Sequence, residues 1–132
     1  MNNIVVILCL SILSTASLAS WVKIDTKQES PVFLNRDQIK RDYPYKHGVQ
    51  VWLKFVTGLD LTSDNKLAQD YKLIRYEADC DKKTRDISAI YIYKEGKIIS
   101  SEEFTKLSYK PVVPNSTGEY NLKQVCDYVY PK

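Results

Sequence analysis

The sequence predicts an α+β domain in which an antiparallel sheet of about five to six strands packs with one C-terminal helix. Several segments alternate apolar and polar residues, as half-buried strands do. Short turns separate the later strands, which favours hairpins and therefore antiparallel pairing. The last segment, residues 120–130, instead repeats its apolar residues at helical spacing.

The first half of the chain contains three expected strands. Residues 21–26 form the first, and residues 32–34 form the second. The third, residues 49–57, is the clearest, because apolar residues occupy every second position. The polar residues 35–42 predict a turn or a single helical turn, and residues 58–66 predict a polar loop.

The second half begins with a three-stranded meander. Residues 71–80, 84–93 and 97–101 are the expected strands, and short turns connect them. Gly96 lies in the second turn, where glycine suits a left-handed backbone. The three strands are therefore expected to pair antiparallel in chain order.

A capped helix is expected at the end of the chain. The sequence Ser116-Thr117-Gly118-Glu119 matches the capping box, in which the serine oxygen and the glutamate side chain satisfy amides at a helix start. Pro131 ends the helix. Its apolar stripe consists of Leu122, Val125, Cys126 and Val129.

Residues 1–19 predict a signal peptide, and residues 20–132 predict a single domain. An apolar run precedes small residues that end at Ala19, which is typical of a cleavage site. A spanning helix would need about 20 apolar residues, more than this run supplies. A lipid anchor would need a small residue before Cys9, where Leu8 stands. We therefore expect export to the periplasm or the outer cell surface, and no transmembrane segment in the mature chain.

Two of the three cysteines, Cys80 and Cys126, remain after export, and an oxidising compartment favours a structural disulfide between them. Free buried thiols and an intermolecular bond are the alternatives. An intramolecular bond would join a strand to the helix and close a loop of about 47 residues, worth about 4 kcal/mol in the chain-entropy model. A redox-active pair is disfavoured, because reactive dithiols usually lie close together as Cys-x-x-Cys.

The residues give little support for catalysis. The single histidine, His47, is expected to be a solvated loop residue, and no serine stands in a recognised nucleophile motif with its partners. With both mature cysteines oxidised, the ligands of a metal site are missing. The net charge of +3 is mild and mixed in sign, which argues against a nucleic-acid binder. We therefore expect no enzyme, no cofactor and no metal.

A basic cluster and many tyrosines remain as candidate binding features. Tyrosine suits protein interfaces, although strands also favour it. The basic cluster could bind an acidic partner or a sulfated polysaccharide, whereas neighbouring aspartates would neutralise it in the alternative interpretation. The cluster consists of Lys82, Lys83 and Arg85, with Lys72 and Arg75 on the preceding strand, and the aspartates are Asp79, Asp81 and Asp86.

Taken together, short motifs in a fixed order resemble the surface-adhesin protein E family, which comprises small exported proteins of Gram-negative bacteria. They cover nearly the whole expected mature chain. In chain order they are Trp21, Asp37-Gln38-Ile39, Val51-Trp52-Leu53, Glu77-Ala78-Asp79-Cys80, residues 93–96, Pro114-Asn115-Ser116 and Val125-Cys126.

The resemblance implies a twisted antiparallel sheet with a helix, a PAS-like fold, and a homodimer. It implies an adhesin for host extracellular proteins such as vitronectin, laminin and plasminogen. Lys82, Lys83 and Arg85 match the basic part of the recognition surface, which follows the central cysteine segment. The founding adhesin is lipid-anchored, whereas Cys9 lacks the required context. The family also includes periplasmic proteins, so the alternative function is a periplasmic PAS-like accessory or small-ligand-binding module.

Overall fold

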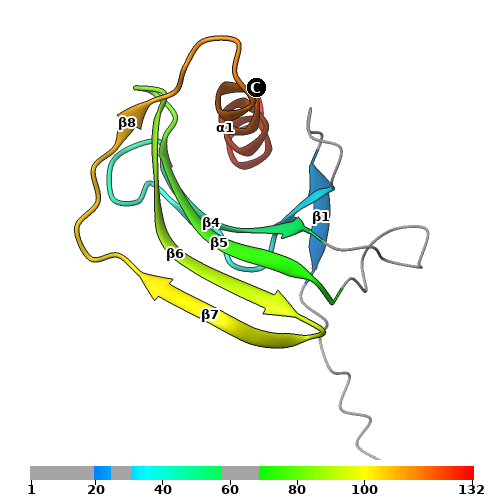
Figure 1. Cartoon of the computed structure of the whole chain (residues 1–132). Coiled ribbons are helices and arrows are strands. Elements are labelled where there is room, and N and C mark those ends of the chain that lie inside the picture. Colours follow the sequence, from blue (N-terminus) through cyan, green and yellow to red (C-terminus); the bar gives the residue numbers. More distant parts are fainter. Residues whose placement is uncertain (1–19, 25–30, 58–68) are drawn as a thin grey trace, which may run out of the picture.

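One curved antiparallel sheet and one helix make up the part of the chain that the computed structural model describes, residues 20–24, 31–57 and 69–132 (Figure 1). Eight strands lie in this part, in the spatial order β1-β2-β4-β5-β6-β7, with β3 paired to β4 and β8 paired to β6. The strands are β1 (Trp21–Ile24), β2 (Val32–Asn35), β3 (Lys40–Arg41), β4 (Gly48–Val56), β5 (Tyr71–Asp79), β6 (Thr84–Lys94), β7 (Lys97–Glu103) and β8 (Lys110–Pro111), and the helix is α1 (Thr117–Val129).

The predicted antiparallel sheet and C-terminal helix are confirmed. The six longer strands match the expected ones, and β5, β6 and β7 form the predicted meander. The helical turn considered for residues 35–42 is wrong, because Lys40 and Arg41 form a short strand beside Gln50 and Val49. The expected signal peptide, residues 1–19, and the expected loop, residues 58–66, lie outside the described residues.

The start of α1 follows the predicted cap in part. Ser116 is the N-cap residue, and its Oγ accepts a hydrogen bond from the Glu119 amide at 3.1 Å. The Glu119 carboxylate accepts from the amide of Asn115 at 3.3 Å, whereas the Ser116 amide donates to the carbonyl of Val113 at 3.2 Å. The serine half of the capping box is therefore present, and the glutamate reaches one residue further back than expected.

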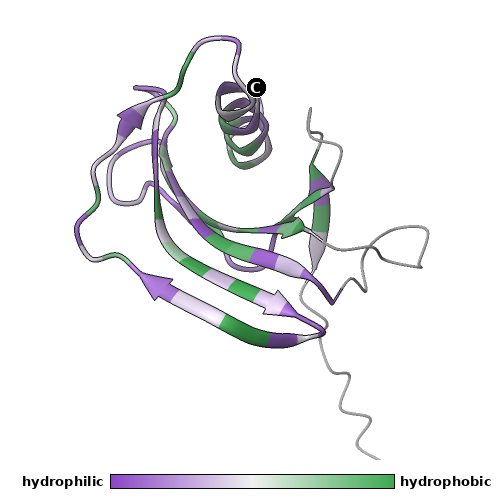
Figure 2. Cartoon of the chain, viewed as in Figure 1, coloured by the Kyte–Doolittle hydropathy of each residue, from purple (hydrophilic) through white to green (hydrophobic). Residues whose placement is uncertain are grey.

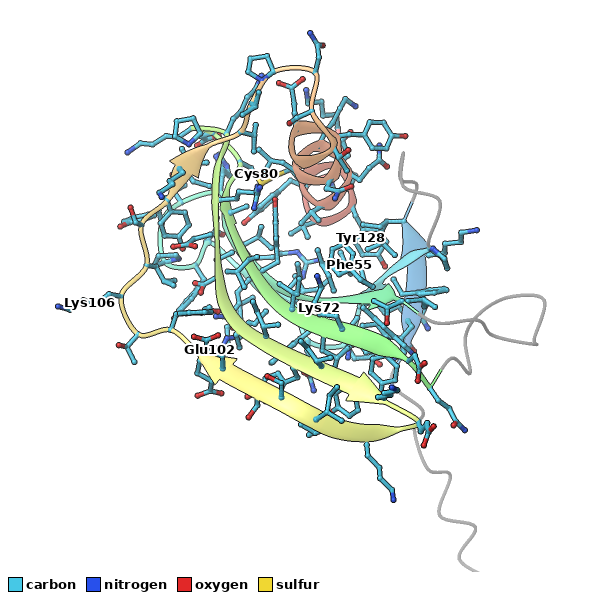
Figure 3. The ribbon with its side chains drawn as sticks, viewed as in Figure 1. Phe55, Lys72, Cys80, Glu102, Lys106 and Tyr128 are labelled. Carbon is cyan, nitrogen blue, oxygen red and sulfur yellow. A yellow bond between two sulfur atoms is a disulfide. The ribbon has the colours of Figure 1, made fainter. Side chains whose placement is uncertain are left out.

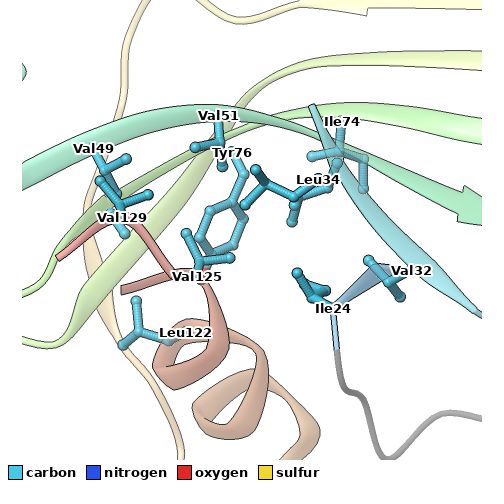
Figure 4. Close-up of a cluster of buried hydrophobic side chains, with 12 residues drawn as sticks. Ile24, Val32, Leu34, Val49, Val51, Ile74, Tyr76, Leu122, Val125 and Val129 are labelled. Carbon is cyan, nitrogen blue, oxygen red and sulfur yellow. The ribbon is translucent and has the colours of Figure 1, made fainter. Parts of the chain in front are cut away.

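The core lies between α1 and the concave side of the sheet (Figure 1). Leu122, Val125 and Val129 of the helix are at most 3% exposed and pack in one cluster with buried strand residues (Figure 4). Apolar residues recur along the strands and on the helix, as the alternating and helical patterns predict (Figure 2). Burial of each such side chain contributes about 1.5–3 kcal/mol, so three of them hold α1 firmly.

The predicted disulfide between Cys80 and Cys126 is confirmed, with a Cα–Cα distance of 5.8 Å (Figure 3). It joins the end of β5 to the last turns of α1. A second attachment lies beside it, because the Tyr130 hydroxyl donates to the Gly48 carbonyl at 2.6 Å and accepts from the Asp42 amide at 2.8 Å. The C-terminal end of α1 is thus attached both to β5 and to the loop before β4.

Candidate binding surfaces

The turn that follows Cys80 carries two exposed lysines on a fixed backbone. The Asp79 carboxylate, in a residue only 5% exposed, accepts the amides of Asp81 and Lys82 at 3.1 and 3.0 Å. The carbonyl of Lys83 accepts the Val112 amide at 3.4 Å. Lys82 and Lys83 are both exposed. We call residues Asp81 to Lys83 the basic turn, and its lysines are presented to solvent from a backbone that hydrogen bonds hold.

The acidic residues near the basic turn have other partners. Asp81 Oδ2 lies 2.8 Å from Nδ1 of His47. The two carboxylate oxygens of Asp86 accept the amides of Ile87 and Ser108 at 2.7 and 2.6 Å. Within the described residues, neither Lys82 nor Lys83 forms an ion pair with these aspartates. The lysine side chains are therefore exposed and unpaired among the described residues, while the three aspartates keep their negative charge nearby.

Arg85 faces the core side of the sheet and not the exposed turn. It lies opposite Ala78, which is fully buried, and opposite Lys110 of β8. Its guanidinium lies beside Gly118 in the first turn of α1, within 3.5 Å of the position that a Cβ would take there. Arg85 is half-buried, so the structure separates it from the two exposed lysines.

Lys72 and Arg75 do not extend the basic cluster, and the expectation that they would is wrong. Lys72 lies near the opposite end of β5, with its Nζ 5.7 Å from the ring centre of Phe55 (Figure 3). Arg75 points to the face away from α1, where its Nε donates to Ser88 Oγ at 2.7 Å and its guanidinium covers Trp52. Both side chains are therefore engaged within the sheet.

Much of the aromatic content lies on the sheet face that α1 does not cover. Tyr71 and Tyr93 are stacked with ring centres 4.5 Å apart, and Trp52 contacts Tyr91 at 5.8 Å. The Tyr91 hydroxyl donates to Glu103 at 2.5 Å, and this hydrogen bond raises the pKa of Tyr91. These cross-strand pairs stabilise the sheet. Tyr71, Tyr91 and Tyr93 therefore have a structural role that is sufficient to explain their place in the strands.

The His47 side chain is 45% exposed, and it also makes specific contacts with other segments of the chain. Besides its contact with Asp81, its ring meets the ring of Tyr130 edge to face at 5.6 Å, and its carbonyl accepts the Cys80 amide at 3.1 Å. No sequence pattern marks this contact, because His47 and Asp81 are 34 positions apart. In the described part of the chain, no group of three or more histidine, cysteine, aspartate or glutamate residues is placed to hold a metal ion.

Two open hollows lie at one edge of the sheet, between β6 and the segment that leads from β7 to β8. Their volumes are about 350 and 260 Å³. The space between the sheet and α1 is occupied by the core cluster. A ligand site enclosed between sheet and helix, as the small-ligand alternative requires, therefore has no support from this packing.

The fold and its surfaces define a disulfide-bonded α+β domain with exposed features suited to binding. The family model described as surface-adhesin protein E matches residues 21–127, and the chain therefore belongs to the surface-adhesin protein E family. Membership implies a non-enzymatic role and an exported or surface protein. No curated protein and no solved structure matches the chain. In the residues described, no helix has the length and apolar character needed to cross a membrane.

Proposed function

We propose that this protein acts after export as a non-enzymatic adhesin for host extracellular proteins of the vitronectin, laminin or plasminogen type. The observation that carries the proposal is the family match over residues 21–127. The expected signal peptide, residues 1–19, would direct export. Display on the outer surface is part of the proposal, since the partners are extracellular.

The proposed contact site is the basic turn, with Arg85 as a half-buried neighbour. Lys82 and Lys83 are exposed on a backbone that Asp79 holds, so little ordering of the main chain is needed on binding. Exposed lysines attract acidic surfaces and mainly raise the rate of association, and salt screens this attraction. Binding through the basic turn should therefore weaken as the salt concentration rises.

The test is binding of the mature protein to immobilised vitronectin, laminin and plasminogen at low and physiological salt. We expect the double variant Lys82→Ala/Lys83→Ala to bind about tenfold more weakly at low salt, with most of the loss in the association rate. The matched control is Lys94→Ala/Lys97→Ala, which removes the same charge from the exposed β6–β7 hairpin. Equal binding by the two double variants would remove the basic turn as the site.

Location separates the adhesin from the periplasmic alternative. Protease treatment of intact cells should digest a surface adhesin, whereas a periplasmic module should be protected until the outer membrane is permeabilised. Protection of this protein on intact cells would exclude surface display and leave the accessory role.

A homodimer is part of the proposal, as the family resemblance implies. β7 lies at an edge of the sheet, and its Ile98 and Ile99 are 54% and 62% exposed. An edge strand with exposed apolar residues is a ready surface for pairing with a second copy. Light scattering of the mature protein should give twice the monomer mass, and Ile98→Lys/Ile99→Lys should return the mass of a monomer.

A further inference from the structure

The two hollows at the sheet edge form one groove. β7 and β8 both pair with β6, but at opposite ends of it, and the segment between them leaves the sheet (Figure 1). The groove lies in this gap. The two hollows share Asp86, Ile87 and Lys106 in their linings, so they adjoin one another along β6.

The segment that closes the groove is held in place by hydrogen bonds. The Ser108 amide donates to Asp86, and the Tyr109 hydroxyl donates to Glu77 Oε1 at 3.3 Å. Burial, with a smaller contribution from the Glu77 carboxylate, raises the pKa of Tyr109 above its ordinary value. The groove is therefore formed before any ligand arrives.

One end of the groove has an excess of positive charge. Arg85, Lys106 and Lys110 line the larger hollow. Asp86 is the carboxylate there, and backbone amides already occupy both of its oxygens. In the described residues, neither lysine forms an ion pair, and the single Asp86 carboxylate offsets only one of the three positive charges.

Two features of Arg85 lower the stability of this part of the sheet when no ligand is bound. Arg85 and Lys110 lie directly opposite each other on β6 and β8, and like charges in that position destabilise a sheet. The Nε of Arg85 is buried and has no hydrogen-bond partner among the described residues. A buried donor without a hydrogen-bond partner lowers the stability of the folded protein. An anionic group bound in this hollow would relieve the charge repulsion.

The other end of the groove is apolar. Ile87, Ile90 and Phe104 line the smaller hollow, and Phe104 remains 37% exposed. A bulge in the β5–β6 pairing turns Ile87 to the same side of the sheet as Ile90. The groove thus offers a basic pocket and an apolar pocket side by side.

We propose that this groove binds an acidic peptide segment, with a carboxylate at Arg85, Lys106 and Lys110 and an adjacent apolar side chain against Ile90 and Phe104. The charge of the larger hollow complements a carboxylate, and the smaller hollow complements an aliphatic or aromatic side chain. A sulfated polysaccharide would match the first hollow and leave the second unused. The site is distinct from the basic turn and does not depend on the proposed adhesin function.

The test uses fluorescent eight-residue peptides with the central sequence Asp-Phe-Asp-Leu between Gly and Ser residues. Fluorescence polarisation gives the affinity, and NMR of the mature protein locates the contact. We expect amide shifts in residues 85–90 and 104–110. Replacing the peptide's two Asp by Asn, or its Phe and Leu by Ser, should weaken binding at least about tenfold, because each pocket would lose its ligand group.

Protein variants test the same contacts from the other side. The exposed double variant Lys106→Ala/Lys110→Ala should lower the affinity about tenfold, whereas Lys82→Ala/Lys83→Ala should leave it unchanged. Arg85→Gln should also weaken binding. Because Arg85 is half-buried, its replacement can alter folding, so the decisive variant is Lys106→Ala/Lys110→Ala. No loss with Lys106→Ala/Lys110→Ala would overturn the proposal. Binding of a heparin octasaccharide at this groove without binding of the peptide would overturn it in favour of a sulfated ligand.

Discussion

Removal of the Cys80–Cys126 disulfide should lower the free energy of unfolding by about 4 kcal/mol. The two cysteines are 46 positions apart, and the chain-entropy model gives about 4 kcal/mol for a closed loop of this length. Domains are typically stable by about 5–15 kcal/mol, so the bond supplies a large share of the total. The burial of Leu122, Val125 and Val129 remains after reduction. We therefore expect the reduced protein to stay folded at 25 °C with a small margin.

The measurement is urea unfolding of the oxidised protein, of the reduced protein, and of Cys80→Ala/Cys126→Ala, followed by circular dichroism. The reduced protein isolates the covalent bond, because it keeps both sulfur atoms in place. Hydrogen exchange should show α1 losing protection before β4 and β5, since the bond attaches the helix to the sheet. A loss of stability below about 1 kcal/mol would refute the reasoning, because the unfolded chain would then gain little entropy from reduction.

Two further predictions concern buried positions. Gly48→Ala should lower the free energy of unfolding, measured in urea, by about 1–3 kcal/mol, because its new Cβ would lie 2.4 Å from the Tyr43 carbonyl oxygen. The control is Gly96→Asn, at an open position with a φ of +75°, and it should lower the free energy of unfolding by less. A larger loss for the control would contradict the prediction. Burial raises the pKa of Tyr76 above its ordinary value of 10.0, so above pH 10 the folded state keeps a proton that the unfolded chain releases. The free energy of unfolding should therefore fall above pH 10 by up to about 1.4 kcal/mol per pH unit. Tyr76→Phe should lessen this alkaline loss and be nearly neutral at pH 7, since the hydroxyl has no partner among the described residues; an unchanged alkaline loss would exclude Tyr76 as its source.

Local patterns were sufficient for the elements that carry the core. Alternation along β4 predicts a buried face that includes Val51, and Val51 is fully buried. The spacing of Leu122 and Val125 gave the buried side of α1. Such patterns succeed because burial on one face forces a period of two in a strand and 3.6 in a helix. The disulfide was predicted on a different basis, the number of cysteines and the expected export of the protein.

The parts that sequence patterns missed depend on tertiary pairing. β3 and β8 are two residues long each, and they exist because β4 and β6 offer partners to them. A bulge between Arg75 and Tyr76 in the β5–β6 register interrupts the alternation of β6, so the face of Ile87 could not be read from its position in the strand. The groove beside β6 follows from these features and has no sequence motif of its own.

Strand pairing also separates the residues of the predicted basic cluster, Lys82, Lys83 and Arg85, onto two surfaces. Lys82 and Lys83 belong to a turn, where side chains are free to reach solvent, and Arg85 is the second residue of β6, where pairing with Ala78 turns it to the core side. A triple alanine variant of Lys82, Lys83 and Arg85 would therefore remove charge from two surfaces at once. A loss of binding in that variant could come from the basic turn or from the groove. The double variants Lys82→Ala/Lys83→Ala and Lys106→Ala/Lys110→Ala separate the two, because each removes two exposed charges from one surface and leaves Arg85 in place.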